Sequence, residues 1–228
     1  MLGKHINKHC EDSLTASVFS HLLHLPSEVF WRILRNACYT DSLPEFAGEP
    51  EMVEPWPNWN PEGTGNTNRV VPDLFLRFAE FDLIIEAKRW DANMQDPEQW
   101  RKELIAYSNR YGKEGVPVKL IALGGIRGVA DDQVRNAGIP CTVHMCKWDR
   151  LLTECQRMKK ELKRLTYSTS HTEAWGRILS DLIDLFAWHS FSTGLWFENF
   201  SFDKHRLSPS IARHLRLFQN RSSQLRTS

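Results

Sequence analysis

The chain has 228 residues, of which 41% are hydrophobic and 25% charged, and its formal net charge at pH 7 is +1. A chain of this length can bury a substantial core within one domain, and its near-zero charge excludes a globally basic coat for nucleic acid. The charge is unevenly placed, because residues 41–62 hold six acids and no Lys or Arg, whereas residues 204–228 hold six Lys or Arg and no acid.

The apolar segments are too short for a membrane protein. None approaches the roughly 20 apolar residues that cross a bilayer, and the Met1 end has no apolar signal segment. Five cysteines, an odd number, are scattered without a disulfide-like framework. We therefore expect a cytoplasmic protein with reduced thiols and no membrane contact.

The first hundred residues predict two helices and a long irregular segment. Residues 11–26, "EDSLTASVFSHLLHLP", have capping residues and helical spacing, and a second helix is expected over residues 27–36. Residues 41–68 hold five prolines with Trp56 and Trp59, which favours irregular structure. The two tryptophans either stack on nucleic-acid bases or pin the segment to the body.

Residues 70–78 and 81–88 are two apolar runs separated by only two residues, a pattern typical of a β-hairpin. Alternate side chains of a strand share a face, so Asp73 and Phe75 look one way while Leu74 and Leu76 look the other.

On the second strand of this hairpin Ile84, Glu86 and Lys88 share a face. Asp73 and Glu86 are then two acids near strand ends that can converge on one point, with Lys88 beside them.

Beyond the hairpin, helices alternate with strands, which predicts a parallel or mixed sheet. Asp96 and Pro97 suit the cap and first residue of a helix. The expected elements are a helix from there to about Tyr111, a strand over 116–125, a helix at Val129–Ala137, a strand over 139–148, and helices from Asp149 onward.

The fold class we expect is α/β, with a mixed four-stranded sheet flanked by helices. We expect one domain, with a core over about residues 11–146 and a helical C-terminal extension over about 147–228.

The hairpin carries "VPD" and, thirteen residues after its aspartate, the glutamate of "IEAK". These residues, Pro72, Asp73, Glu86 and Lys88, resemble the site motif of the PD-(D/E)xK nuclease superfamily. The resemblance covers about residues 11–146 and implies a restriction-endonuclease-like αβββαβ core with additional C-terminal helices.

Such a site implies a divalent cation, Mg²⁺ with Mn²⁺ as a substitute, because phosphodiester hydrolysis needs an activated water and a counter-charge. Mg²⁺ prefers hard oxygen ligands, so Asp73 and Glu86 are expected to bind it directly, with the Ala87 carbonyl. Lys88 is expected to position the attacking water. Members of the superfamily often supply an acid from the first helix, which here is Glu11, binding metal through water or completing a second ion's shell.

Related nucleases often place a glutamine, sometimes with a tyrosine, on the helix after the lysine strand. Gln99, Glu103 and Tyr107 fall along one face of that helix. Gln99 is expected to orient the lysine or the scissile phosphate, supported by Tyr107. A structural interpretation stays open, in which Glu86 and Lys88 are an ion pair and Tyr107 belongs to the core.

Other patterns suggest sites more weakly. Cys141, His144 and Cys146 are close in sequence, but Cys141 faces away from the other two on a strand, and no further pair completes four zinc ligands. "LGGIRG" lacks a complete phosphate-loop motif and is expected to form a tight turn.

Two basic segments near the C-terminus can follow a phosphate backbone or form a solvated helix face. Their cationic residues are Arg157, Lys159, Lys160, Lys163, Arg164, Arg213, Arg216 and Arg221.

Together these features predict a metal-dependent deoxyribonuclease, with DNA rather than RNA as the expected substrate. The chain shows no targeting module, so specificity would come from its small body, from a homodimer or from a partner protein. Such an architecture resembles effectors of phage defence or mobile elements. The alternative is a non-catalytic nucleic-acid-binding or assembly subunit that retains the nuclease fold.

Overall fold

The computed structural model describes residues 11–89, 94–136, 139–164 and 169–192, all of which belong to one unit of the chain, residues 1–193. In these ranges no helix is long and apolar enough to cross a membrane. Cys10 lies outside the described residues. The other four cysteines, Cys38, Cys141, Cys146 and Cys155, are buried free thiols.

A mixed sheet forms the centre of this unit. Its six strands are β1 (Met52–Pro55), β2 (Leu74–Arg77), β3 (Asp82–Ala87), β4 (Val118–Leu123), β5 (Asp132–Asn136) and β6 (Ile139–Cys146). They lie in the order β1-β2-β3-β4-β6-β5. The first three are antiparallel to one another, β3, β4 and β6 are parallel, and β5 is antiparallel to β6. The predicted mixed α/β class is confirmed.

The predicted number of four strands is wrong, because two edge strands were missed. β1 lies within the segment expected to be irregular, and its Pro55 ends the strand at a sheet edge, where a missing N–H costs little. β5 replaces the helix predicted at Val129–Ala137. Only Val134 is buried among residues 131–135, and Val129 is 55% exposed. Such a segment has no apolar helical face, so pairing with β6 decides its structure.

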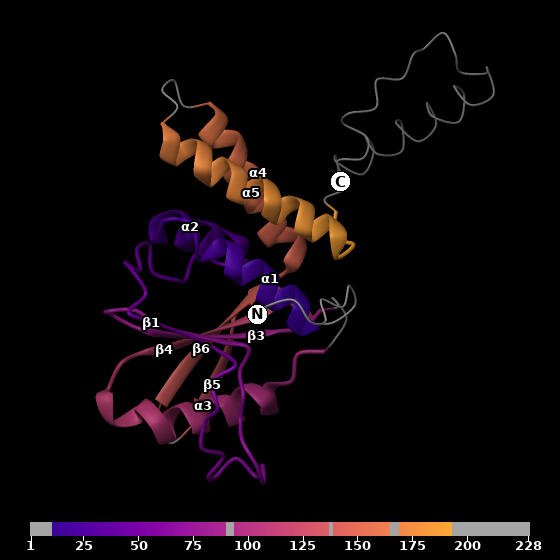
Figure 1. Cartoon of the computed structure of the whole chain (residues 1–228). Coiled ribbons are helices and arrows are strands. Elements are labelled where there is room, and N and C mark those ends of the chain that lie inside the picture. Colours follow the sequence, from indigo (N-terminus) through magenta and orange to yellow (C-terminus); the bar gives the residue numbers. More distant parts are fainter. Residues whose placement is uncertain (1–10, 90–93, 137–138, 165–168, 193–228) are drawn as a thin grey trace, which may run out of the picture. The chain divides into compact units, whose positions relative to one another are not determined.

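Within the described ranges, five α-helices and one 3₁₀ turn surround the sheet. They are α1 (Glu11–Leu22), α2 (Ser27–Ala37), α3 (Pro97–Tyr111), η1 (Gly112–Glu114), α4 (Trp148–Lys163) and α5 (Ser170–Trp188). Figure 1 shows α1, α2, α4 and α5 on one side of the sheet and α3 on the other. The predicted cap of α3 is confirmed, since the Asp96 carboxylate accepts a hydrogen bond from the Glu98 N–H.

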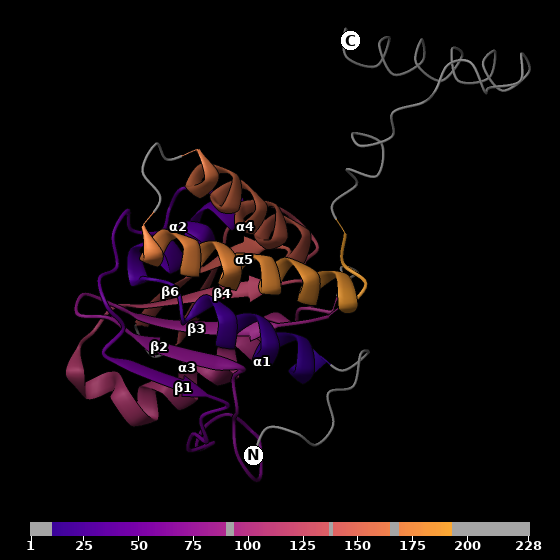
Figure 2. The ribbon, with the colours of Figure 1, turned by 45° about the horizontal axis from the view of Figure 1, so that its top comes forward.

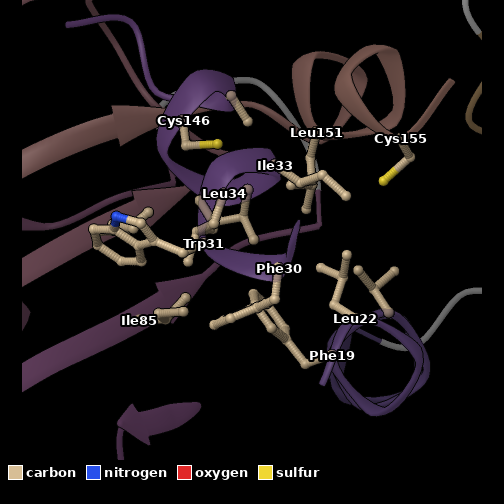
Figure 3. Packing of buried hydrophobic residues seen from close by; sticks show 14 of the residues in the cluster. Phe19, Leu22, Phe30, Trp31, Ile33, Leu34, Ile85, Cys146, Leu151 and Cys155 are labelled. Atoms are coloured by element: carbon tan, nitrogen blue, oxygen red, sulfur yellow. The ribbon is translucent and has the colours of Figure 1, made fainter. Parts of the chain in front are cut away.

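The larger core fills the space between the four helices and the sheet. Phe19 of α1, Leu34 of α2, Leu151 of α4 and Ile85 of β3 belong to this cluster, as Figure 3 shows. Figure 2 shows α1 beside α5. This packing holds the first residue of α1 near the end of β3.

The smaller core lies under α3 and is aromatic. Trp59 is 1% exposed and contacts Phe75 and Tyr107 edge-on, while Phe75 stacks on Tyr111 with ring centroids 5.1 Å apart. The backbone N–H of Trp59 also donates to the Val70 carbonyl oxygen. Trp59 therefore pins the proline-rich segment to the body, one of the two expected roles for this residue.

The alternation predicted for the hairpin is confirmed. Phe75 and Ile84 lie in the core under α3, whereas Leu74, Leu76 and Ile85 lie in the core under the four helices. Because Leu74 at the start of β2 pairs with Ile85 near the end of β3, the next residues outward, Asp73 and Glu86, meet at one end of the sheet.

Candidate active site

Asp73 ties the two halves of the hairpin together. It stands just before β2 and is buried, and its Oδ2 accepts a hydrogen bond of 2.7 Å from the backbone N–H of Ala87. The sheet register places these residues together, because the start of β2 lies against the end of β3. Asp73 and the "EAK" residues thus form one structural unit, as the hairpin predicts.

Glu86 is the acceptor at the centre of the site. Its Oε1 accepts a 2.6 Å hydrogen bond from Nε2 of Gln99 and is also bonded to Nζ of Lys88. Gln99 therefore reaches the site, as expected, but it contacts the glutamate rather than the lysine. The Glu86–Lys88 ion pair is also the one that the structural interpretation anticipates.

Gln95 holds the backbone of Glu86 from α3's side of the sheet. Its Nε2 donates to the carbonyl oxygens of Glu86, at 2.9 Å, and of Gly124, at 3.2 Å. The indole N–H of Trp100 donates in turn to the Gln95 Oε1 at 2.8 Å. Sequence reasoning missed Gln95, which precedes the α3 cap and carries no pattern of its own.

Lys88 follows β3 directly, and its backbone is bonded on both sides. Its N–H donates to the Leu123 carbonyl oxygen at 2.7 Å, and its own carbonyl oxygen accepts from the indole N–H of Trp148 at 2.9 Å. The Lys88 ammonium lies 3.7 Å from Oε1 of Glu11. These contacts fix the direction in which the lysine leaves the sheet.

Glu11, the first residue of α1, is brought into the site as the resemblance implies. Its Oε2 accepts a 2.7 Å hydrogen bond from the backbone N–H of Arg89. The Arg89 guanidinium donates to the carbonyl oxygen of His189, at the end of α5. Glu11 thus contacts two consecutive residues of the segment that leaves β3.

Glu103 is a further acid that lies behind Glu86. Its side chain is 1% exposed, and among the described residues no N–H or O–H group donates to either carboxyl oxygen. Burial, the Glu86 charge and a hydrogen bond to the Glu86 carboxylate raise the pKa of Glu103 well above its usual range. The protonated carboxyl can donate its O–H to Glu86. The helical spacing from Gln99 was the available signal, but we expected no role for this residue.

The remaining charges of the site are also perturbed. Burial and the Glu86 charge raise the pKa of Asp73 to about 7, against the lowering effect of the Ala87 hydrogen bond. Burial works against the charged form of Lys88, but the Glu86 charge and hydrogen bond outweigh it and raise the lysine's pKa. In this arrangement Lys88 is therefore a cation that donates hydrogen bonds.

Tyr107 does not belong to this site, and its expected supporting role is wrong. Its hydroxyl donates to Oδ2 of Asp82 at 2.8 Å, and Asp82 is the first residue of β3, at the strand's other end from Glu86. Two turns of α3 carry the side chain away from the Gln99 end. The alternative assignment of Tyr107 to the core is confirmed.

No family model matches the chain. It is 30% identical over 186 residues to the uncharacterized protein PM0110 of Pasteurella multocida (strain Pm70), and the match covers 78% of this chain and 69% of that protein. The chain belongs to the same family as PM0110. The name of that relative states no activity.

The carboxyl groups suit a hard divalent cation by their number and type. Asp73, Glu86, Glu11 and Glu103 come from four elements and influence one another's charge, while Lys88 is the ammonium that faces them. Two carboxylates about 4 Å apart repel by roughly 4 kcal/mol at an effective dielectric constant near 20, and a divalent cation would relieve that repulsion.

The present side-chain arrangement is not that of a formed metal centre. In the described ranges, no three His, Cys, Asp or Glu side chains are placed so that they could hold an ion. The hydrogen bonds described above use Oδ2 of Asp73 and Oε1 of Glu86. Oδ1 of Asp73 and Oε2 of Glu86 are therefore the atoms that would bind a metal, together with the Ala87 carbonyl oxygen.

The glycines of "LGGIRG" form the tight turn that was expected. Gly124 and Gly125 have φ angles of +70° and +61°, a conformation that L-residues with a side chain rarely adopt. Both lie against Lys88. The turn therefore serves the candidate site by letting two strand ends approach closely.

The residues of the zinc interpretation are separated by the sheet. Cys141 lies in the core under α3 and Cys146 in the core under the four helices, as strand alternation predicts. Nδ1 of His144 lies 3.1 Å from Oδ2 of Asp131, and Ser42 bonds to both groups. His144 thus has a local acid partner.

The basic segments are described only in part. Arg157 on α4 forms ion pairs with Glu154 and Glu161, as expected of a solvated helix face. The candidate phosphate contacts Arg213, Arg216 and Arg221 lie outside the described residues.

Proposed function

We propose that this protein is a metal-dependent nuclease that hydrolyses phosphodiester bonds, with DNA as its main substrate. The observation that supports the proposal best is the contact between Asp73 and the end of β3. The Asp73 carboxylate accepts a hydrogen bond from the Ala87 N–H, and Glu86 and Lys88 are the residues on either side of Ala87. Acids from α1 and α3 reach the same place. Carboxylates with a neighbouring lysine can hold a divalent cation and neutralise charge on a phosphate, as metal-assisted phosphodiester hydrolysis needs.

Mg²⁺ or Mn²⁺, when bound, would supply a polarised water and neutralise charge on the phosphate. Oxygens of Asp73, Glu86 and Ala87 would hold it. The chain's own residues act around it: Lys88, kept cationic, donates a hydrogen bond to the attacking water or a phosphate oxygen. Gln99 orients the Glu86 carboxylate, and Gln95 fixes the backbone on which Glu86 stands.

Lys88 must leave Glu86 before Glu86 can bind a metal through both of its oxygens. The Glu86–Lys88 pair therefore favours the second candidate function, a nucleic-acid-binding or assembly subunit whose site stays closed. Binding of metal distinguishes the two proposals without reference to cleavage, because a closed site would gain no stability from Mn²⁺.

The test uses the full chain with Mg²⁺ or Mn²⁺ against supercoiled plasmid, single-stranded DNA and RNA. We expect cleavage by the wild type, at least a hundredfold loss in Asp73→Ala and Lys88→Ala, and no loss in Glu98→Gln, an exposed acid of α3 outside the site. Thermal melting with Mn²⁺ should show stabilisation of the wild type and not of Asp73→Ala. Cleavage that survives both site substitutions would disprove the assignment.

A further inference from the structure

A cavity of about 210 Å³ lies beside the candidate active site, between α1 and the edge of the sheet. Thr15 and Phe19 of α1 line one side, and Pro55 and Trp56 at the end of β1 line the other. Asp73 lies in its wall as well, so the cavity is next to a residue of the candidate active site. We call it the Trp56 cavity.

Trp56 is presented to this cavity by an unusual backbone. Its φ angle is +48°, a conformation that is costly for a bulky residue and is found mainly at functional positions. Its N–H donates to the Asp73 carbonyl oxygen at 3.1 Å, which fixes the tryptophan next to the site. The side chain is 39% exposed, whereas Trp59 is 1% exposed. Trp59 already pins the segment, so the exposed ring of Trp56 is not needed for that purpose.

We propose that the Trp56 cavity binds a nucleobase, that of the nucleotide whose phosphate lies at Asp73. The inference rests on the proposed nuclease function. The base stacks on the Trp56 ring, as bases do on exposed aromatic side chains of nucleic-acid-binding proteins. A cavity of about 150 Å³ already accepts a benzene ring, so the size suits one base.

A base in this position must be unstacked from its neighbours. Enzymes that act on nucleotides obtain such access from single strands, or by extruding the nucleotide from a duplex. The substrate class for this site is therefore single-stranded DNA, or duplex DNA at a frayed end, gap or mismatch.

The experiment measures binding, separately from cleavage. The probe is a single-stranded thymidine oligonucleotide with internal 2-aminopurine, whose fluorescence is quenched on stacking, and Ca²⁺ replaces Mg²⁺ at constant salt. We expect quenching by the wild-type full chain. Trp56→Ala should abolish the quenching and weaken binding about tenfold, the lower range for loss of one stacking contact. Trp56→Phe should restore part of both.

Two further variants keep the test interpretable. Trp56→Gly removes the ring and suits the positive φ, so it gives the same result as Trp56→Ala if the ring alone matters. Phe46→Ala removes an aromatic side chain that is 78% exposed outside this cavity, and we expect wild-type behaviour.

The outcomes separate the two proposals. One outcome is that the wild type binds the oligonucleotide while Trp56→Ala and Trp56→Gly quench the 2-aminopurine fluorescence as strongly as the wild type. In that case the cavity inference is wrong and the nuclease proposal stands. The cavity would then belong to an apolar partner segment. If the wild type binds neither this oligonucleotide nor duplex DNA, the proposed function fails, and the cavity inference falls with it.

Discussion

The backbone of Gly124 passes so close to Lys88 that a β-carbon at position 124 would lie 2.0 Å from the Lys88 carbonyl oxygen. The same atom would lie 2.8 Å from the Trp148 indole nitrogen, which donates to that oxygen. The glycine is therefore required both by its positive φ and by the space at the end of β3.

We predict that Gly124→Ala lowers the free energy of unfolding by at least about 1–3 kcal/mol, the cost of a strained backbone position, and weakens cleavage by displacing Lys88. Urea denaturation measures the first effect and plasmid cleavage the second. Gly128→Ala is the matched control, since a β-carbon there meets nothing within 4 Å. Equal stability of the two variants would contradict the account.

Tyr107→Phe tests whether this tyrosine serves the fold rather than the site. The hydroxyl donates to Asp82, a buried carboxylate that also pairs with Arg77. Its loss should cost roughly 1–3 kcal/mol of stability, as for hydrogen bonds to charged groups, with the cleavage rate of the folded protein unchanged. Tyr111→Phe loses longer contacts, 3.4 Å to Glu54 and 3.7 Å to the Met52 sulfur, and should cost less. If Tyr107→Phe lowers the cleavage rate without lowering the free energy of unfolding, Tyr107 has a role in the candidate site.

The hairpin and its faces were predictable because strand periodicity acts locally. Apolar residues on both faces of β3 and a two-residue gap before it define the register, and register alone brings Asp73 to Glu86. Helix α3 was predictable for a similar reason, since Asp96 and Pro97 mark its start through local backbone chemistry.

The edge strands and the full set of site residues were not predictable, because tertiary packing decides them. β5 exposes most of its side chains and exists through its pairing with β6. Glu103 and Gln95 join the site only because α3 packs against the end of the sheet. Trp56 and Trp59 are alike in sequence context, and only the fold shows that one is buried and the other faces a cavity.

Glu103→Gln should stabilise the metal-free protein at alkaline pH. Because the pKa of Glu103 is raised in the folded state, the folded protein holds a proton that the unfolded chain releases, and stability falls as pH rises above the ordinary glutamate range. The amide can donate to Glu86 without this cost. We expect a gain of roughly 1–3 kcal/mol at pH 8 and a flatter dependence of stability on pH, measured by urea denaturation in EDTA.

Glu98→Gln, on the exposed side of α3, is the control for that substitution and should leave the dependence of stability on pH unchanged. If Glu103→Gln is destabilising at pH 8, Glu103 is charged in the folded protein. It then donates no O–H hydrogen bond to Glu86.

His144 should make the free energy of unfolding decrease at acid pH. Burial, only partly opposed by the Asp131 charge, lowers the pKa of His144 to about 4, so the ring is neutral in the folded protein and its Nδ1–H donates to Asp131. The unfolded chain binds a proton near pH 6.5. Between these values the unfolded state holds more protons, so the stability contribution is complete above pH 6.5 and is lost as pH falls towards and through 4.

The contribution amounts to roughly 3 kcal/mol, at about 1.4 kcal/mol for each pKa unit. His144→Asn keeps an acceptor or donor at the Nδ1 position and cannot titrate, so the stability difference between wild type and variant should shrink as pH falls from 7 to 4. Urea denaturation in EDTA at several pH values measures that difference. Asp73 titrates in the same range, but its contribution to stability is present in both proteins and does not affect the difference between them. His171→Asn, at an exposed position of α5, should leave the curve unchanged. A difference that stays constant with pH would mean that His144 is already charged in the folded state.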